Sequence, residues 1–431
     1  MLSEIDQIVR QEIDPQGPGV AIAVVKDGKP VHIGGYGVAN LEWICPIEST
    51  TVFRLASVTK QFTAVAIMLL ERQGKLRLDD SITTYLPDYP THGRTITITH
   101  LLTHTSGIKS YTSLDTFLTD IAKKDITPGE VVASFKDLPL EFEPGTCFRY
   151  NNSGYHLLGL IIEQVTGMSY ERYIQHNLFQ PLGMNHSYYL HHERIIPRRA
   201  SGYEKTVEGY RHADYLNMMI PYAAGSLGST VEDLIRWDAA LREGWLLDTA
   251  TQERLYTPVQ LANGCTEAYG FGVGTTSYQG HRLIHHAGGI PGFSTFLARF
   301  IDDAAMIAIL ANTPGIAVEK IMRTIACSIF DIPPTIHTPL VLDTAILDKA
   351  VGTYITEEGF SVEIAREGNT LALSSPFAWN LLPISETVYY ASQDHECEIH
   401  FADEHEGVFT KLTGYLPITP SFKATRTRPL A

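Results

Sequence analysis

The chain lacks the regular cysteine pattern of small disulfide-bonded or metal-binding proteins. Its 431 residues include only 5 cysteines, an odd number at widely spaced positions. A disulfide framework uses an even set of cysteines, so we expect none here. Zinc-helix, phosphate-loop and dinucleotide motifs are also missing from the sequence. We therefore expect no cofactor and no metal, although His100 and His104 stand four residues apart, because no third ligand accompanies them.

Long apolar runs are absent as well. No segment reaches the length that a membrane-spanning helix needs. Residues 1–14 carry acidic side chains where a signal peptide would have its apolar core. As written, the sequence predicts a cytoplasmic protein without a membrane span. A leader removed from the mature chain would leave the same sequence, and the protein would then be periplasmic or secreted.

Basic residues are fewer than acidic residues in this chain. Lysine and arginine number 33 against 48 aspartates and glutamates, which gives a net charge of −15. This balance disfavours nucleic acid and anionic membranes as partners. A small molecule or peptide is the expected substrate, and a homo-oligomer stays open. With 44% hydrophobic residues, a chain of this length can bury a large core and form two domains.

A serine and a lysine stand three residues apart in Ser57-Val58-Thr59-Lys60. The apolar residues around them recur at helical spacing: Val58, Phe62, Val65 and Leu69. The spacing predicts a helix from Ser57 to near Gly74, with Lys60 on nearly the same face as Ser57. A serine needs a neighbouring base to become a nucleophile, and a buried lysine can lose its proton. The backbone N–H groups of the first helical turn can stabilise an oxyanion.

A second pattern, Tyr150-Asn151-Asn152, lies well downstream. Both short patterns have competing copies in this chain. The second Ser-x-x-Lys, residues 106–109, lies in a polar stretch without helical period, and we interpret it as a loop. The second Tyr-x-Asn is residues 215–217. Residues 224–228 nearly match the nucleophile elbow of another hydrolase fold, but no strand-to-helix switch surrounds them, so a loop beside the active site is preferred.

Longer segments resemble the superfamily of class C beta-lactamases and penicillin-binding proteins. They are FRLASVTKQFTA around Ser57, ITHLLTHTSGI at 98–108, FEPGTCFRYNNSGYHLLGLIIEQVTGMSYERYI at 142–174, and HHAGGIPGFST at 285–295. The resemblance implies that Ser57 is the nucleophile and Lys60 its partner. It also implies that Tyr150 is a general base and later a general acid, and that Asn152 binds a substrate amide.

The third element of that superfamily departs from its commonest form. This chain has His286-Ala287-Gly288 where Lys-Thr-Gly is usual, a variant similar to D-aminopeptidase-like and esterase-like relatives. An imidazole then replaces a permanent ammonium. Alternatively, the double histidine is a strand-end pair with one packed and one solvated ring. Gly288 and Gly289 suit a strand where backbone approaches a ligand. We expect the N–H groups of Gly289 and Ser57 to form the oxyanion site.

The resemblance implies an α/β (α+β) beta-lactamase-like fold, in which both chain ends form an antiparallel sheet flanked by helices and a helical lobe is inserted between them. The active site would lie between sheet and lobe. Asp27-Gly28 predicts a hairpin between two early strands. We expect this hydrolase domain to cover residues 1–335.

After a proline-rich stretch, short alternating segments predict a second domain over residues 341–431. Turn signals at residues 366–369 and 403–407 predict two hairpins. This part resembles the lipocalin-like β-barrel of several D-peptide hydrolases, and we expect it to lack a ligand of its own.

Together these features predict a serine hydrolase that forms an acyl-enzyme on Ser57 and cleaves an amide or ester, with D-residue peptides or small esters as leading substrates. One alternative is a beta-lactamase or D-Ala-D-Ala carboxypeptidase. Another is a non-catalytic penicillin-binding or scaffolding protein, against which the intact Ser57, Lys60, Tyr150 and Asn152 set argues.

Overall fold

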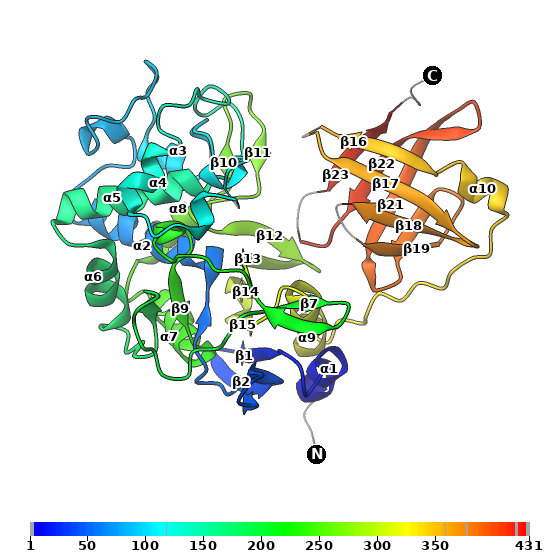
Figure 1. Cartoon of the computed structure of the whole chain (residues 1–431), viewed down its shortest axis with the longest axis horizontal. Coiled ribbons are helices and arrows are strands. Elements are labelled where there is room, and N and C mark those ends of the chain that lie inside the picture. Colours follow the sequence, from blue (N-terminus) through cyan, green and yellow to red (C-terminus); the bar gives the residue numbers. More distant parts are fainter. Residues whose placement is uncertain (1–3, 118, 358, 376–377, 419–420, 428–431) are drawn as a thin grey trace. The chain divides into compact units, whose positions relative to one another are not determined.

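The computed structural model describes residues 4–117, 119–357, 359–375, 378–418 and 421–427. The chain divides into two compact units, one up to Asp331 and one from Ile332 onward (Figure 1). None of the helices in the described part of the chain contains an apolar stretch of the length that spans a bilayer.

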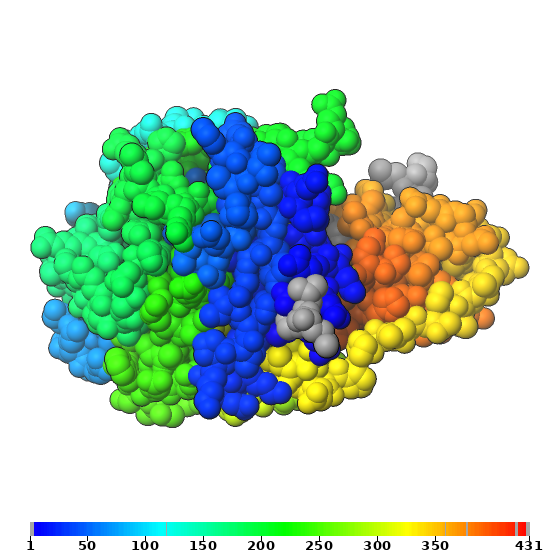
Figure 2. Space-filling view, turned by 90° about the horizontal axis from the view of Figure 1, so that it is seen from below, coloured from blue at the N-terminus to red at the C-terminus, as the bar shows by residue number. Residues whose placement is uncertain are grey.

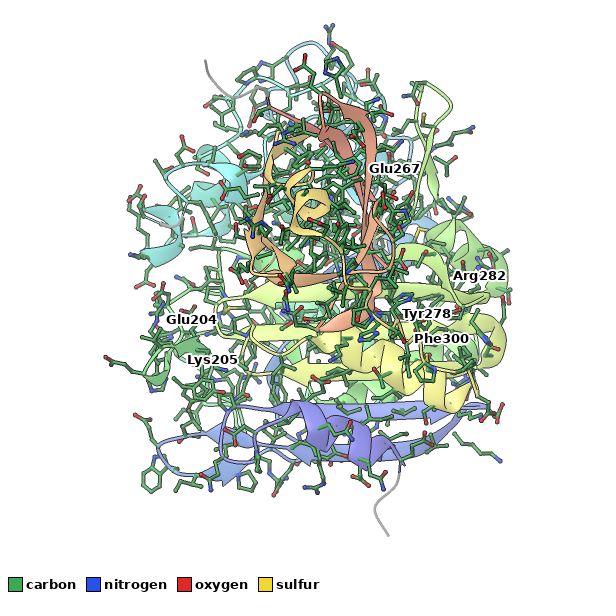
Figure 3. All side chains as sticks on the ribbon, turned by 90° about the vertical axis from the view of Figure 1, so that its right-hand side faces the viewer. Glu204, Lys205, Glu267, Tyr278, Arg282 and Phe300 are labelled. Atoms are coloured by element: carbon green, nitrogen blue, oxygen red, sulfur yellow. The ribbon has the colours of Figure 1, made fainter. Side chains whose placement is uncertain are left out.

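A six-stranded antiparallel sheet organises the first unit. Its strands, in spatial order, are β12 (Gly274–Tyr278), β13 (His281–Ile290), β14 (Phe293–Phe300), β15 (Ala305–Ala311), β1 (Val20–Lys26) and β2 (Lys29–Tyr36). β1 pairs with β15, so the two ends of this unit meet in the sheet as predicted. Figure 3 labels Tyr278, Arg282 and Phe300 on the neighbouring strands β12, β13 and β14.

Helices cover both faces of this sheet. Ala21, Ala23 and Val25 of β1 belong to the core cluster that includes Trp237 of α7 (Val231–Arg242). The alternate residues of β1 face the other way, and α9 (Val318–Ile329), which contacts α1 (Glu4–Glu12), packs on β14 and β15. With both faces covered, β1 reads as a nearly continuous apolar run.

β1 and β2 form the hairpin predicted at Asp27-Gly28. Both turn residues have positive φ angles, 50° and 72°, as a two-residue hairpin turn of this kind requires. β2 is the edge strand and leaves much of its surface exposed. In Figure 2 the N-terminal segment, coloured blue, forms a continuous band on the surface.

The segment between the two parts of the sheet forms a helical lobe. Its other helices are α2 (Thr59–Arg72), α3 (Ile98–Leu102), α4 (Pro128–Ala133), α5 (Asn152–Thr166), α6 (Tyr170–Ile174) and α8 (Thr249–Tyr256). Its short strands are β3 (Val38–Asn40), β4 (Cys45–Pro46), β5 (Phe53–Arg54), β6 (Tyr188–Tyr189), β7 (Tyr203–Thr206), β8 (Gly209–His212), β9 (Leu227–Ser229), β10 (Val259–Gln260) and β11 (Thr266–Glu267).

α2 begins two residues later than the sequence predicts. Ser57 lies in a 3-10 turn, Ala56–Val58, and Ala56 has a left-handed φ of 48°. The chain therefore enters the helix through a tight turn that presents Ser57 just ahead of it. From Thr59 to Leu70 every residue of α2 is buried, which makes it the central helix of the unit.

α5 starts directly behind Tyr150. The side chain of Asn151 accepts a hydrogen bond from the Gly154 N–H at 3.0 Å and so caps the helix. Gly167, with a φ of 67°, ends it in the left-handed conformation. The cap fixes the first residue of the helix, Asn152, against the chain that carries Tyr150.

The second unit is a closed antiparallel barrel with a short helix, α10 (Thr344–Asp348), before it. Its strands follow one another in chain order: β16 (Gly352–Thr356), β17 (Ser361–Glu367), β18 (Thr370–Ser375), β19 (Trp379–Pro383), β20 (Val388–Ala391), β21 (Asp394–His405), β22 (Val408–Tyr415) and β23 (Phe422–Arg426). The expected all-β barrel is confirmed. The two predicted hairpins are confirmed too, with Glu367 opposite Thr370 and His405 opposite Val408.

A buried ion pair links the sheet to α7. Arg299 Nε donates to Asp238 Oδ1 at 2.8 Å, and Arg242 Nη1 donates to Asp238 Oδ2 at 2.7 Å. Arg299 is 5% exposed and Asp238 4%. The arginine charge is therefore buried against one carboxylate, and the Tyr256 hydroxyl accepts a further hydrogen bond from it at 2.6 Å.

Asp238→Ala should lower the free energy of unfolding by about 3–5 kcal/mol, because it leaves Arg299 buried without its anion. Urea unfolding at pH 7 measures the change. Asp79→Ala is the matched control, since the Arg77–Asp79 pair is exposed and should contribute nothing measurable. Equal midpoints for Asp238→Ala and wild type would contradict this role of the pair.

Candidate active site

The amine of Lys60 is the centre of the site. Lys60 is fully buried, and its Nζ lies 3.0 Å from Ser57 Oγ, 2.8 Å from Asn152 Oδ1 and 3.0 Å from the Ala224 carbonyl oxygen. Burial lowers the pKa of Lys60 well below its ordinary value. A neutral amine has two N–H donors and one lone pair. The amide and carbonyl oxygens take the two donors, so the lone pair is left for the hydroxyl of Ser57.

Tyr150 stands on the open side of this amine. Lys60 Nζ lies 4.8 Å from the centre of the Tyr150 ring, and 39% of Tyr150 is exposed. Desolvation raises the pKa of Tyr150, while a hydrogen bond with Ser57 acts in the opposite direction with a smaller effect. The phenol therefore keeps its proton at neutral pH, which favours Lys60 over Tyr150 as the group that first accepts a proton.

Asn152 is oriented by two hydroxyl groups that sequence reasoning missed. Its Nδ2 donates to Thr112 Oγ1 at 3.1 Å, and its backbone N–H donates to Ser110 Oγ at 3.2 Å. The two hydroxyls lie 2.9 Å apart. With Nδ2 held by Thr112, the amide oxygen must face Lys60. The only sequence signal for this pair was the polar character of the stretch around it.

The competing serine and tyrosine patterns lie in other environments. Lys109 Nζ pairs with Glu141 at 2.8 Å, away from Ser106. Ser226, in the segment that nearly matches a nucleophile elbow, is buried and donates its hydroxyl to the Met218 carbonyl. Within this segment it is the Ala224 carbonyl that reaches the site.

The second Tyr-x-Asn pattern points its polar atoms at one carboxylate. Tyr215 donates its hydroxyl to Asp125 at 3.0 Å, and Asn217 Nδ2 donates to the same oxygen at 2.9 Å. Tyr215 nevertheless lines the pocket beside Ser57. This copy therefore builds part of the wall.

His286 is buried and neutral. Its Nδ1 donates to the Ala287 carbonyl at 2.6 Å, and its Nε2 accepts a hydrogen bond from the Tyr269 hydroxyl at 2.9 Å. Burial lowers the pKa of His286 to about 3. Tyr269 was missed in the sequence, because nothing in its local pattern distinguishes it from a core tyrosine. Both ring nitrogens are engaged, so His286 supplies no fixed positive charge.

His285, the other histidine of the pair, is partly buried and stacks on Phe296 with 5.5 Å between ring centres. The two glycines that follow the pair differ in their surroundings. A Cβ on Gly288 would lie 2.2 Å from Thr295 Oγ1 and 2.3 Å from the Leu55 carbonyl oxygen, so only glycine fits there. A Cβ on Gly289 would meet nothing within 4 Å, and Gly289 lines the pocket together with Ser57.

A cavity of about 490 Å³ opens beside Ser57, Asn152 and Gly289. Its walls come from the helical lobe and from the end of β13, as expected for a site between lobe and sheet. They are mainly apolar and include Phe117, Leu216, Pro221, Ile290 and Pro291. A cavity of this size and lining accommodates an apolar substrate side chain next to the serine.

The family model named Beta-lactamase matches residues 5–326. The chain belongs to the beta-lactamase family. It is 32% identical over 396 residues to penicillin-binding protein 4* of Bacillus subtilis (strain 168), a match that covers 86% of this chain and 87% of that protein. It is a serine hydrolase of the superfamily that includes beta-lactamases and penicillin-binding proteins.

Two solved structures show the same fold. An octameric penicillin-binding protein homologue from Pyrococcus abyssi superposes with a TM-score of 0.70 at 27% identity and covers 98% of this chain and 99% of its own. A D-amino acid amidase from Ochrobactrum anthropi SV3, complexed with L-phenylalanine, superposes with a TM-score of 0.68 at 26% identity. This match covers 76% of this chain and 98% of the amidase.

His286→Asn should leave the shape of the pH–rate profile unchanged between about pH 5 and 9, because an imidazole with a pKa near 3 does not titrate there. Stability should respond. Below about pH 6.5 the unfolded chain binds a proton on His286, whereas the folded chain does not. The contribution of this group to the free energy of unfolding is therefore lost as pH falls from about 6.5 toward 3. The variant should lose less stability than wild type between pH 7 and pH 5, as measured by urea unfolding. If a limb of the pH–rate profile moves in His286→Asn, His286 titrates in the working enzyme.

Proposed function

We propose that this protein cleaves an amide or ester through an acyl-enzyme on Ser57. The proposal is carried by the position of Lys60 Nζ, which has Ser57 Oγ, Asn152 Oδ1 and the Ala224 carbonyl as its three partners. Lys60 and Tyr150 are its proton carriers.

In the first step, Ser57 Oγ attacks the substrate carbonyl carbon while its proton passes to the lone pair of Lys60. The carbonyl oxygen becomes an oxyanion, for which we assign the backbone N–H groups of Ser57 and Gly289 as donors. The role of Gly289 is supported by its place beside Ser57 in the cavity.

Collapse of the intermediate expels the amine or alcohol, which takes a proton from the Tyr150 hydroxyl. Lys60 then returns its proton to the phenolate, whose ring centre lies 4.8 Å from Nζ. Water attacks the acyl-enzyme and gives up a proton along the same two groups, which releases the acid and restores Ser57. Asn152 binds the substrate amide with the Nδ2 that Thr112 orients.

The substrate class follows from the third motif. A neutral His286 offers no ammonium to a substrate carboxylate, so D-residue peptides bound without use of their carboxylate, their amides or small esters are favoured over substrates that are bound through a free carboxylate. The similarity to a D-amino acid amidase supports this direction. A beta-lactamase or D-Ala-D-Ala carboxypeptidase is the second candidate, favoured by the similarity to penicillin-binding protein 4*.

We also propose that residues 1–335 form the hydrolase domain and residues 341–431 a lipocalin-like domain without its own ligand. Apolar side chains such as Leu371, Tyr389 and Ile399 fill the core of this barrel. A homo-oligomer is supported by the octameric relative from Pyrococcus abyssi.

Ser57→Ala should abolish covalent labelling by a fluorophosphonate and lower kcat on p-nitrophenyl esters by about 10⁴-fold or more, as loss of a nucleophile does in a unit-like set. Intact mass of the labelled protein and ester turnover measure the two effects. Ser106→Ala and Ser226→Ala are the matched controls and should keep both. Loss of labelling in a control but not in Ser57→Ala would overturn the assignment of the nucleophile.

His286→Lys should raise cephalosporin turnover relative to ester turnover, because it adds a cation where relatives bind a substrate carboxylate. A charge-assisted hydrogen bond is worth about 1.5–3 kcal/mol, which corresponds to roughly 10- to 150-fold in recognition. Parallel assays with a chromogenic cephalosporin and a p-nitrophenyl ester give the ratio. Efficient cephalosporin hydrolysis by wild type, with no relative gain in the variant, would favour the beta-lactamase alternative.

A further inference from the structure

His104 is a buried histidine for which the proposed reaction has no use. It is 1% exposed, and its Nδ1 accepts a hydrogen bond from the Asn151 backbone N–H at 3.0 Å. Within the part of the chain that the structure describes, its Nε2 has no hydrogen-bond partner. A buried polar atom without a partner costs free energy, so a histidine here needs a reason.

The backbone of His104 binds the same segment from the other side of Tyr150. Its carbonyl oxygen accepts a hydrogen bond from the Arg149 N–H at 2.9 Å. One residue therefore holds the chain immediately before and immediately after Tyr150. To do so, His104 adopts a left-handed φ of 59°, which is uncommon for a residue with a side chain.

The imidazole also contacts the Tyr150 ring. Their ring centres lie 4.4 Å apart, and the rings of Tyr269 and Tyr155 follow at 4.8 Å and 5.2 Å. Tyr150 thus packs against the ring of His104, the residue that accepts hydrogen bonds from both chain neighbours of Tyr150. Since a catalytic phenol misplaced by 1 Å can cost about 10²-fold in rate, this contact bears on turnover.

The imidazole is neutral, with its proton on Nε2. A proton on Nδ1 would face the Asn151 N–H, donor against donor. Burial lowers the pKa of His104 well below its ordinary value. A cation at this position would also oppose proton transfer to Lys60, so the neutral form suits the site.

We propose that His104 is a positioning residue for Tyr150, which holds the phenol in register with Ser57 and Lys60 through its Nδ1 acceptor and its backbone carbonyl. The inference rests on the proposed role of Tyr150 as a proton carrier. It assigns the acceptor atom, rather than the ring volume, as the feature that turnover requires.

Two substitutions separate the acceptor from the ring. His104→Asn places an amide oxygen near the position of Nδ1 and tolerates a left-handed φ, but it loses the ring. His104→Phe keeps a ring and loses the acceptor. Fluorophosphonate titration of Ser57 gives the number of active sites, against which p-nitrophenyl ester turnover is normalised.

Per labelled site, His104→Phe should lower kcat by about 10²-fold with KM within about threefold, whereas His104→Asn should stay within about tenfold of wild type. A purely packing role reverses this order, because the asparagine leaves the larger void. Retention of kcat in His104→Phe, or an equal loss in His104→Asn, would therefore overturn the proposal. If the phenylalanine variant does not fold, His104→Leu, which also lacks an acceptor, takes its place with the same expectation.

His100→Phe is the matched control. His100 Nδ1 accepts the Thr97 N–H at 3.2 Å in the cap of α3, so this imidazole acceptor holds a helix start and not the neighbours of Tyr150. Its loss should lower stability and leave kcat per labelled site unchanged.

Amide hydrogen exchange gives a readout that does not depend on turnover. The Asn151 amide should exchange slowly in wild type and in His104→Asn, and faster in His104→Phe. If Ser57 is never labelled, the proposed reaction fails, but this exchange pattern still decides whether His104 holds the segment. Equal exchange in all three proteins would refute the positioning role.

Discussion

The site depends on the burial of a single amine. Lys60 loses its water entirely, and an ammonium without water or a counter-ion is unfavourable in such a place. The neutral amine then needs partners for two N–H groups, which Asn152 and Ala224 provide. What remains is a lone pair directed at a serine. The helix α2, the start of α5 and the loop before β9 all meet at this amine.

The local part of this arrangement could be predicted from the sequence. Ser57 and Lys60 lie three residues apart, so one helical turn, which begins here as a 3-10 turn, brings them together. The Asp27-Gly28 hairpin and the barrel hairpins are equally local. Tyr150 and Asn152 lie too far along the chain for such an argument, and only the resemblance to a family of known enzymes connected them with Ser57. The helix start was wrong by two residues, because a left-handed Ala56 cannot be read from an ordinary alanine.

The other contacts of the site could not be predicted, and the reason is physical. Lys60 meets Ala224 across 164 residues, and Tyr269 reaches His286 through a side chain that its own neighbours do not specify. Thr112 and His104 act through the orientation of an amide and the tautomer of an imidazole. Hydrogen bonds of this kind depend on where separate segments meet, and the local periodicity of the sequence does not indicate which segments meet. The same applies to the protonation state of His286. This imidazole is neutral near pH 6 only because burial in the fold lowers its pKa.

The pairing of β1 with β15 has a consequence for synthesis on the ribosome. Val20 lies opposite Ala311 in the finished sheet. About 290 further residues must therefore be synthesised after β1 before its partner β15 is complete. At the usual pace of translation this interval is roughly 15–60 s. During that time β1 can pair only with β2, as an isolated hairpin with both faces uncovered. The apolar faces of β1 therefore stay uncovered through most of synthesis, and the six-stranded sheet can close only after the helical lobe has been made.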